Sequence, residues 1–96
     1  APVYVPNAMT IVYLKPTSNG IIEKNVLCKH PNVEELYIPE GTTELESWAV
    51  ENCPNLKVAY LPLNTECNET EAFVGVHPDF KIVRMDMTGI KDVIAD

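Results

Sequence analysis

Histidine and cysteine are the side chains of this 96-residue sequence that could bind a metal ion or act as a nucleophile. Cys28 and His30 are separated by a single residue, but two ligands on one loop are too few for a zinc site. A Cys53 thiolate activated by a histidine is a second candidate, yet neither oxyanion donors nor a residue that orients the base can be named. We therefore expect a protein without enzymatic activity, metal or other cofactor.

The other reactive or charged groups favour structural interpretations. Glu66, Glu69 and Glu71 could bind calcium, but the sequence contains no EF-hand type loop, so a solvated acidic surface is favoured. The three cysteines of the sequence cannot all pair within one chain. A disulfide between Cys28 and Cys67 stays open as an alternative, and reduced thiols are the expectation because no disulfide framework is recognisable.

The formal net charge of −7 is concentrated in the middle of the sequence. Residues 1–32 carry a net charge of +2, whereas residues 33–79 carry −9. Because so acidic a segment repels phosphate groups, no nucleic acid is expected among the partners. The sequence has no apolar run of about 18 residues, so no membrane span is expected. Its first residues do not resemble an uncleaved signal peptide.

Any functional side chains must be positioned by a unit that repeats at a nearly constant interval along the sequence. Pro16, Pro39 and Pro62 are separated by 23 residues in both steps, and the segments that follow them share one apolar pattern. A fixed period in this range predicts a solenoid of stacked turns. A segment of alternating polar and apolar residues in each turn predicts one short parallel strand. The expected strands cover residues 10–15, 34–38, 57–61 and 81–85.

The central repeat carries the most specific pattern of the sequence. It reads Leu36-Tyr37-Ile38-Pro39-Glu40-Gly41, followed by Leu45, Ala49, Val50, Cys53 and Leu56. This pattern resembles the BspA-type leucine-rich repeat, also called the Treponema pallidum type, and the resemblance covers about residues 10–86. The sequence departs from the family pattern at Glu46, where glycine is usual, and by one residue inserted near His77. The two outer repeats match less well than the central one.

The resemblance implies an α/β solenoid with a curved parallel sheet of about four short strands on its concave side and short helical or irregular connecting turns. It also implies protein binding or adhesion and no catalytic residues. We expect an extended N-terminal arm at residues 1–9, the leucine-rich-repeat solenoid at residues 10–86 and a C-terminal cap at residues 87–96. In this cap, Ile90, Val93 and Ile94 are expected to cover the exposed end of the core.

The outward residues of the expected strands form a candidate protein-binding surface, because alternation along a strand sends every second side chain away from the core. One outward row is expected to contain Tyr13, Tyr37, Tyr60 and Arg84, and a second row Glu35, Val58 and Ile82. Tyrosine and arginine are enriched at binding hot spots, so this face could dock a partner. The alternative is that the tyrosines only pack against one another across the strands.

Trp48 is a separate candidate for protein binding. The inward positions of its turn are occupied by Leu45, Ala49 and Val50, so the indole ring is expected to be partly exposed. An exposed tryptophan would anchor a partner. In the alternative, the ring folds back over the convex surface of the turn.

These features together predict a structural or protein-interaction subunit. We expect it to belong to a larger assembly, such as a virion or phage decoration protein, with capsid or other assembly subunits as partners and a homo-oligomer as a further option. Three or four turns are near the minimum for a stable solenoid, so outside contacts would help so short a stack. The alternative is a secreted or cell-surface module of a bacterium or protist that binds or adheres through the concave sheet face.

Overall fold

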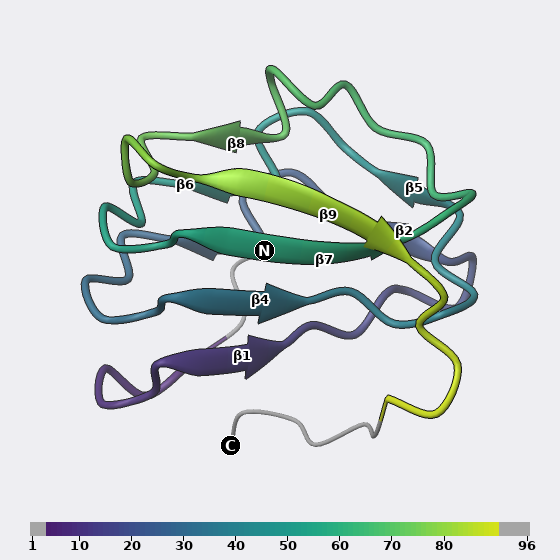
Figure 1. Cartoon of the computed structure of the whole chain (residues 1–96), viewed down its shortest axis with the longest axis horizontal. Helices are drawn as coiled ribbons and strands as arrows, with labels where there is room; N and C mark the ends of the chain where they lie inside the picture. Colours follow the sequence, from purple (N-terminus) through teal and green to yellow (C-terminus); the bar gives the residue numbers. More distant parts are fainter. Residues whose placement is uncertain (1–3, 91–96) are drawn as a thin grey trace.

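The computed structural model describes residues 4–90 and shows an all-β parallel solenoid of about three turns (Figure 1). Its turns wrap three parallel sheets around one core. The four-stranded sheet contains β1 (Ile11–Tyr13), β4 (Glu35–Tyr37), β7 (Val58–Pro62) and β9 (Lys81–Met85). The second sheet contains β2 (Ile21–Ile22) and β5 (Glu44–Leu45), and the third contains β3 (Leu27–Cys28), β6 (Val50–Glu51) and β8 (Phe73–Val74).

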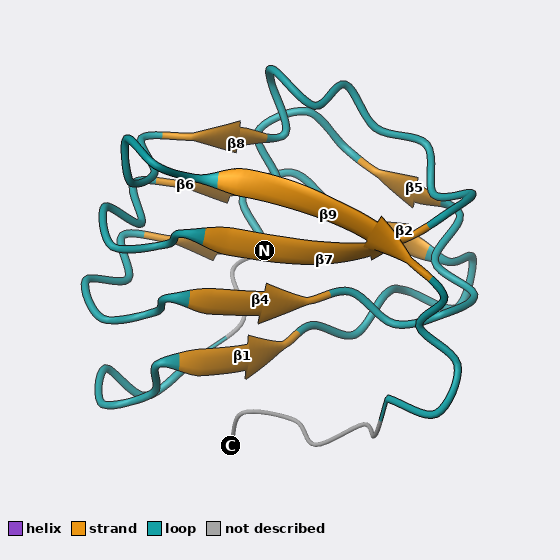
Figure 2. Ribbon diagram, in the orientation of Figure 1, coloured by secondary structure: helices purple, strands orange, loops and turns teal. Residues whose placement is uncertain are grey.

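The predicted α/β class is wrong, because residues 4–90 contain no helix (Figure 2). The segments expected to form helical or irregular turns contain the two-residue strands of the second and third sheets. Their backbone groups bond to neighbouring turns rather than within one segment, as where Leu27 N donates to Ala49 O over 3.1 Å. A helix of so few residues would be marginal alone, so bonding between turns prevails. No helix in this part of the chain could cross a membrane.

The predicted parallel sheet with one strand per turn is confirmed, and its register aligns equivalent residues of successive turns. Val12 pairs with Leu36, and Leu36 pairs with Ala59, so these inward side chains stack in the core. The prediction for the last strand is wrong by one residue, because Tyr60 pairs with Val83 rather than with the following residue. The outward row of β1, β4 and β7 therefore continues with Val83 of β9 rather than with Arg84.

The shift arises in the corner before β9. Val74 pairs with Glu51 in the third sheet, and Lys81 pairs with Val58 in the four-stranded sheet, so both pairings keep the sequence interval of the earlier turns. The residue that the sequence pattern treats as an insertion is therefore part of a corner of ordinary length. Phe80 takes the last position of this corner, where it packs against the core.

Left-handed backbone conformations recur at equivalent corners of successive turns. Lys29, Asn52 and Gly75 follow one another at the repeat interval and have φ angles of 56°, 58° and 70°. Asn25 and Trp48 form a second such pair, with φ angles of 59° and 62°. These angles are uncommon for residues other than glycine, most of all for bulky ones. The path of the solenoid thus sets the backbone conformation at these corners, whichever side chain is present.

Residues 4–9 close the N-terminal end of the core. Val5 is buried, and Pro6 O accepts a hydrogen bond from His30 Nε2 over 2.9 Å. Met9 N donates to Pro6 O over 3.0 Å, and the same kind of contact closes the corners of later turns. This segment is therefore the closing corner of an incomplete preceding turn, and it lies against the first full turn.

Residues 86–90 leave the solenoid after β9 and run back past the ends of earlier strands (Figure 1). Met87 is buried, and its N–H donates to Glu40 Oε1 over 3.0 Å. Ile90 lies near the ends of β1 and β4, whereas the cap was expected to cover the last turn of the core. The rest of the expected cap, residues 91–96 with Val93 and Ile94, and residues 1–3 of the expected arm lie outside the described residues.

Candidate functional site

Three tyrosines form a stacked ladder across the four-stranded sheet. The ring centroids of Tyr13 and Tyr37, and those of Tyr37 and Tyr60, are 4.7 Å apart, with interplanar angles of 16° and 17°. This spacing matches the ~4.8 Å between neighbouring strands, because the tyrosines hold the same register position in β1, β4 and β7. The rings lie in one row, as expected, and each is partly exposed. We call this row the tyrosine ladder.

Glu35 lies beside the tyrosine ladder and orients its middle ring. Tyr37 Oη donates a hydrogen bond to Glu35 Oε1 over 3.0 Å. Burial, followed by this hydrogen bond and the negative charge of Glu35, raises the pKa of Tyr37 to about 12. The hydroxyl therefore keeps its proton at neutral pH. A carboxylate accepts several hydrogen bonds, so Glu35 can also accept one from a partner.

The outward face of the four-stranded sheet carries little net charge. The row beside the tyrosine ladder consists of Ile11, Glu35, Val58 and Lys81, in which one carboxylate and one ammonium group balance. Val58 is only 8% exposed, so it contributes packing more than an accessible contact. Several exposed carboxylates lie on the second sheet and in the loops of the last turn, among them Glu44, Glu66, Glu69 and Glu71.

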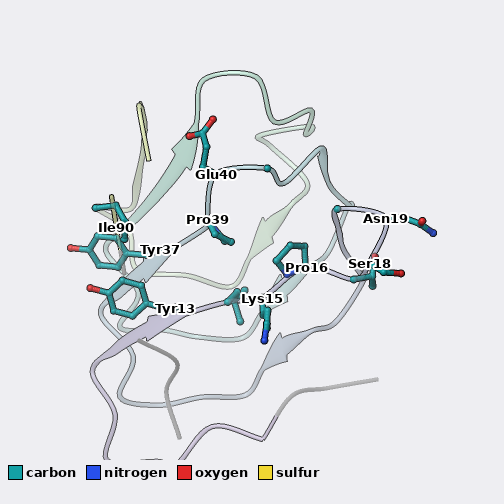
Figure 3. Close-up of a pocket in the computed structure, with 13 residues that line it drawn as sticks. Tyr13, Lys15, Pro16, Ser18, Asn19, Tyr37, Pro39, Glu40 and Ile90 are labelled. Carbon is teal, nitrogen blue, oxygen red and sulfur yellow. The ribbon is translucent and has the colours of Figure 1, made fainter. Parts of the chain in front are cut away.

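A groove of about 430 Å³ adjoins the tyrosine ladder at the ends of β1 and β4 (Figure 3). Tyr13, Tyr37 and Ile90 lie close together on one side, and Pro16 and Pro39 line it further along (Figure 3). Its polar lining includes Lys15, Ser18, Asn19 and Glu40. The prolines that recur at the repeat interval thus extend the aromatic surface with a second apolar surface.

Arg84 does not continue the tyrosine ladder, which corrects the prediction. It pairs with Leu61, an inward position, and its guanidinium lies at the C-terminal end of the solenoid. Arg84 Nη1 donates to Pro62 O over 3.0 Å and to Thr65 O over 2.5 Å, and Nε forms a 3.0 Å ion pair with Glu69. Charge-assisted bonds of this kind satisfy carbonyl groups of the last turn. Arg84 therefore holds this end of the fold together.

Ile82 also points inward, where the prediction placed it in the second outward row. It pairs with Ala59 and packs against the core. Val83 takes the outward position next to Tyr60, so the tyrosine ladder ends on an aliphatic side chain. Either phase of the alternation in β9 puts a charged residue on the inward side, so the sequence pattern alone does not identify the correct phase.

Trp48 lies on a corner between the second and third sheets, away from the tyrosine ladder. The residue is 46% exposed, so the indole is partly exposed, as expected. Trp48 N donates to Glu71 O over 2.7 Å, and Trp48 O accepts a hydrogen bond from Asn25 N over 2.8 Å. Lys24 Nζ lies 5.2 Å from the ring centroid, within the range of a cation–π contact. The indole is thus held at the surface by a left-handed backbone position.

Replacing Trp48 by asparagine should stabilise the protein. The equivalent corner of the preceding turn has Asn25, and asparagine tolerates left-handed backbone angles better than a bulky residue does. We expect the free energy of unfolding of W48N to rise by about 0.5–1 kcal/mol, as measured by urea denaturation. The reverse substitution, Asn25→Trp, should lower it by at least as much. A less stable W48N would mean that the exposed ring contributes more packing than strain.

His30 joins the N-terminal segment to the first full turn. Its Nε2 donates to Pro6 O over 2.9 Å, and its Nδ1 accepts from Val33 N over 3.1 Å. Both ring nitrogens are therefore occupied, in the tautomer with the proton on Nε2. Across residues 4–90, no group of three or more histidine, cysteine, aspartate or glutamate side chains is placed to hold a metal ion.

Cys28, Cys53 and Cys67 are free thiols. Cys28 and Cys67 are partly buried and do not form the disulfide that the sequence left open. Burial raises the pKa of the Cys53 thiol, and burial likewise raises the pKa of Cys67 more than the nearby Arg84 lowers it. A reactive cysteine requires a lowered pKa.

Sequence reasoning missed two parts of this site, Glu40 and Ile90. Glu40 accepts the hydrogen bond of Met87 N across 47 positions of the chain, and Ile90 lines the groove. A single contact between such distant positions leaves no periodic signal. Pro16 and Pro39 are visible in the sequence through their spacing, but the pattern predicts only that they end strands.

Comparison with protein-family models, curated proteins and solved structures finds no match to this chain. The fold that the structure supports is a β-solenoid of about three turns, with no family assigned by these comparisons.

Proposed function

We propose that this protein is a non-enzymatic interaction subunit that binds a protein partner through the tyrosine ladder. The observation that carries the proposal is three stacked, partly exposed rings in one row on an open sheet face. No other segment of residues 4–90 crosses the front of β1, β4 and β7 (Figure 1). Solenoids commonly present such an extended surface to their partners.

The physical properties of this face suit a protein interface. Tyrosine offers a large contact area with few rotatable bonds, and stacking already restricts these rings, so little further side-chain entropy is lost on binding. The cores of interfaces are depleted of charge, and the two rows on this face carry balanced charges from Glu35 and Lys81 alone. The groove beside Tyr13 and Tyr37 would receive an apolar side chain of the partner.

A diverged BspA-like leucine-rich repeat is the family that we propose for this solenoid. The central repeat from Leu36 to Leu56 resembles the family unit, and the repeat interval of the sequence recurs between paired strands. The parallel sheet with one strand per turn is the element that such a repeat would place on its binding side. We propose further that the protein is a subunit of a larger assembly, such as a virion or phage decoration protein, because neighbours would stabilise so short a stack.

The test removes two of the three rings of the tyrosine ladder and leaves the core intact. A partner captured from the source cells would be identified, purified and titrated against the protein by calorimetry. We expect the double variant Tyr37→Ala and Tyr60→Ala to bind at least about 30-fold more weakly, since a hot-spot side chain is worth about 2 kcal/mol. Circular dichroism should show that the fold is retained.

The matched control alters another side of the solenoid. Glu44→Ala with Glu66→Ala removes two exposed carboxylates away from the tyrosine ladder and should change the affinity by less than about threefold. A partner that depends on these carboxylates, and binds the tyrosine variant as tightly as the parent, would refute the proposal.

A further inference from the structure

Among residues 4–90, the C-terminal end of the solenoid core is left open, whereas the N-terminal end is covered. At the N-terminal end, Val5 is buried beneath the first turn. At the C-terminal end, Phe80 and Ile82 are only partly buried, and Val74 and Met85 are exposed. Figure 1 shows β9 as the outermost strand of the four-stranded sheet at this end. The terminal turns of solenoids need a polar cap or another covering surface.

The edge of β9 has backbone groups without partners in the described part of the chain. Lys81 N donates to Lys57 O over 3.0 Å, so the residues of β9 that bond to β7 are alternate ones, beginning with Lys81. The N–H and C=O groups of Ile82 and Arg84 therefore point away from β7. β9 is five residues long and contains no proline. Such an edge is a template on which a further strand can pair.

An inward charged side chain often protects an edge strand from pairing, and Arg84 is such a residue. Its guanidinium, however, is already bonded to Pro62 O, Thr65 O and Glu69 on its own chain. The charged guanidinium thus stabilises the neighbouring corner of the last turn. The backbone of β9 is left accessible.

We propose that a second copy of this chain covers the open end, with the two β9 strands paired antiparallel about a two-fold axis at Val83. In an antiparallel ladder, the bonded pairs are opposite residues whose N–H and C=O groups both face the partner strand. Ile82 and Arg84 have these groups free, so Ile82 of each copy would face Arg84 of the other. The two Val83 side chains would then lie opposite each other on the outward face.

Neighbouring registers are less favourable. A shift in one direction places Arg84 opposite the same residue of the second copy, where like charges repel. A shift in the other direction requires the N–H of Phe80, which already donates to His77 O over 2.9 Å. The self-complementary arrangement about Val83 is therefore the one that uses the free groups of β9 without these conflicts.

The size of the open end is sufficient for a dimer. The Cα atoms extend over 28 × 27 × 24 Å, and the turns stack along the middle dimension in Figure 1. An end of this width offers ~600 Å² per copy, which reaches the lower limit of specific interfaces. A head-to-tail arrangement would instead place the open end on the three-residue strand β1, beside a core that Val5 already closes. It would also give an open filament rather than a closed dimer.

Charge gives the proposed contact a distinctive salt dependence. Glu66 and Glu71 are exposed in the last turn, so each copy would bring negative charge towards the contact. Their repulsion is screened as salt is added. The dimer should therefore become tighter between about 50 and 500 mM salt. Association through the tyrosine ladder would respond far less, because that face is nearly neutral.

Sedimentation velocity of the full chain over about 10 µM to 1 mM, at both salt concentrations, tests the proposal. We expect a reversible monomer–dimer equilibrium that Val83→Lys weakens at least tenfold. Ile11→Lys is the matched control, because it adds the same charge to the same face at the opposite edge, and it should leave the equilibrium unchanged. A monomer at the highest concentration, a mass that grows beyond the dimer, or equal effects of V83K and I11K would each overturn the proposal.

Two further readouts separate the dimer from a folding defect and from the proposed function. Hydrogen exchange at the amides of Ile82 and Arg84 should slow as the concentration of the parent protein rises. The variant Ile82→Pro removes one of these N–H groups without breaking a bond to β7, so it should be folded and monomeric. Tyr37→Ala with Tyr60→Ala should dimerise like the parent. Ladder variants that fail to dimerise would instead place the contact on the tyrosine ladder and overturn the β9 pairing.

Discussion

Replacing Leu61 by alanine is expected to lower the free energy of unfolding by about 2–5 kcal/mol. Leu61 is fully buried in β7, where it pairs with Arg84 on one side. On the other side, Ile38 N donates to Tyr60 O over 2.9 Å, which places the buried Ile38 next to Leu61. Backbone ladders on both sides hold the turns apart, so the core cannot collapse into the cavity that alanine would leave.

The measurement for Leu61→Ala is urea or thermal denaturation. One kcal/mol shifts the melting temperature of a domain of this size by about 4–8 °C, so the loss should be at least about 8 °C. Leu63 lies two residues further along and is 64% exposed, which makes Leu63→Ala the matched control, with an expected change below about 0.5 kcal/mol. If the two variants melted alike, the inward placement of Leu61 would be incorrect.

Replacing Gly75 by alanine should be almost as damaging, although it adds only one methyl group. Gly75 has a φ angle of 70°, and a Cβ atom there would lie 2.7 Å from Asn52 Oδ1 and 3.2 Å from the backbone N and Cα of Asn52. Asn52 cannot move away easily, because its N–H donates to Val74 O over 2.8 Å in the ladder between turns. We expect the free energy of unfolding to fall by about 2–4 kcal/mol, from left-handed strain plus the forced shift.

Gly41→Ala separates these two contributions. Gly41 has a φ angle of 90°, but a Cβ atom there would have no neighbour within 4 Å. This variant should therefore cost only the strain of a left-handed alanine, about 1–2 kcal/mol. Chemical denaturation of both variants gives the comparison. Equal losses would show that the close approach of Gly75 to Asn52 is relieved without cost.

The tyrosine ladder could be predicted from the sequence because two independent periods agree. The repeat interval places Tyr37 and Tyr60 in the same position of successive turns, and strand alternation places both on the side opposite the buried Leu36 and Leu61. A shift in register would contradict the repeat spacing, and exchanging the two faces of a strand would contradict the alternation. Because both periods place the tyrosines in the same outward row, the pattern excludes either error. The stacked rings follow directly from that agreement.

The remaining strands could not be predicted because they are too short to show alternation. Strands such as β3, with Leu27 and Cys28, contain two residues, and a period of two cannot be recognised in two residues. In β9, both phases of the alternation place a charged residue inward, so the alternation does not identify the correct phase. The apparent extra residue in the preceding corner then leads the prediction to place Ile82 and Arg84 on the wrong face of the sheet. The groove depends on Ile90, which is brought to Tyr13 by a return of the chain that has no counterpart in the other turns.

The described residues cover the N-terminal end of the core better than the C-terminal end, so local unfolding should begin at the C-terminal end. In stacked repeats, each turn is stabilised mainly by its neighbours, so a terminal turn with one open side opens at a lower free energy than the turns below it. We expect transient opening of the native state to begin at β9 and at the corner that Arg84 stabilises. The turn in which His30 bonds to Pro6 should open last. Proteases would then cut unassembled copies from the C-terminal side, and a molecule seated on that end would lengthen the lifetime of the chain.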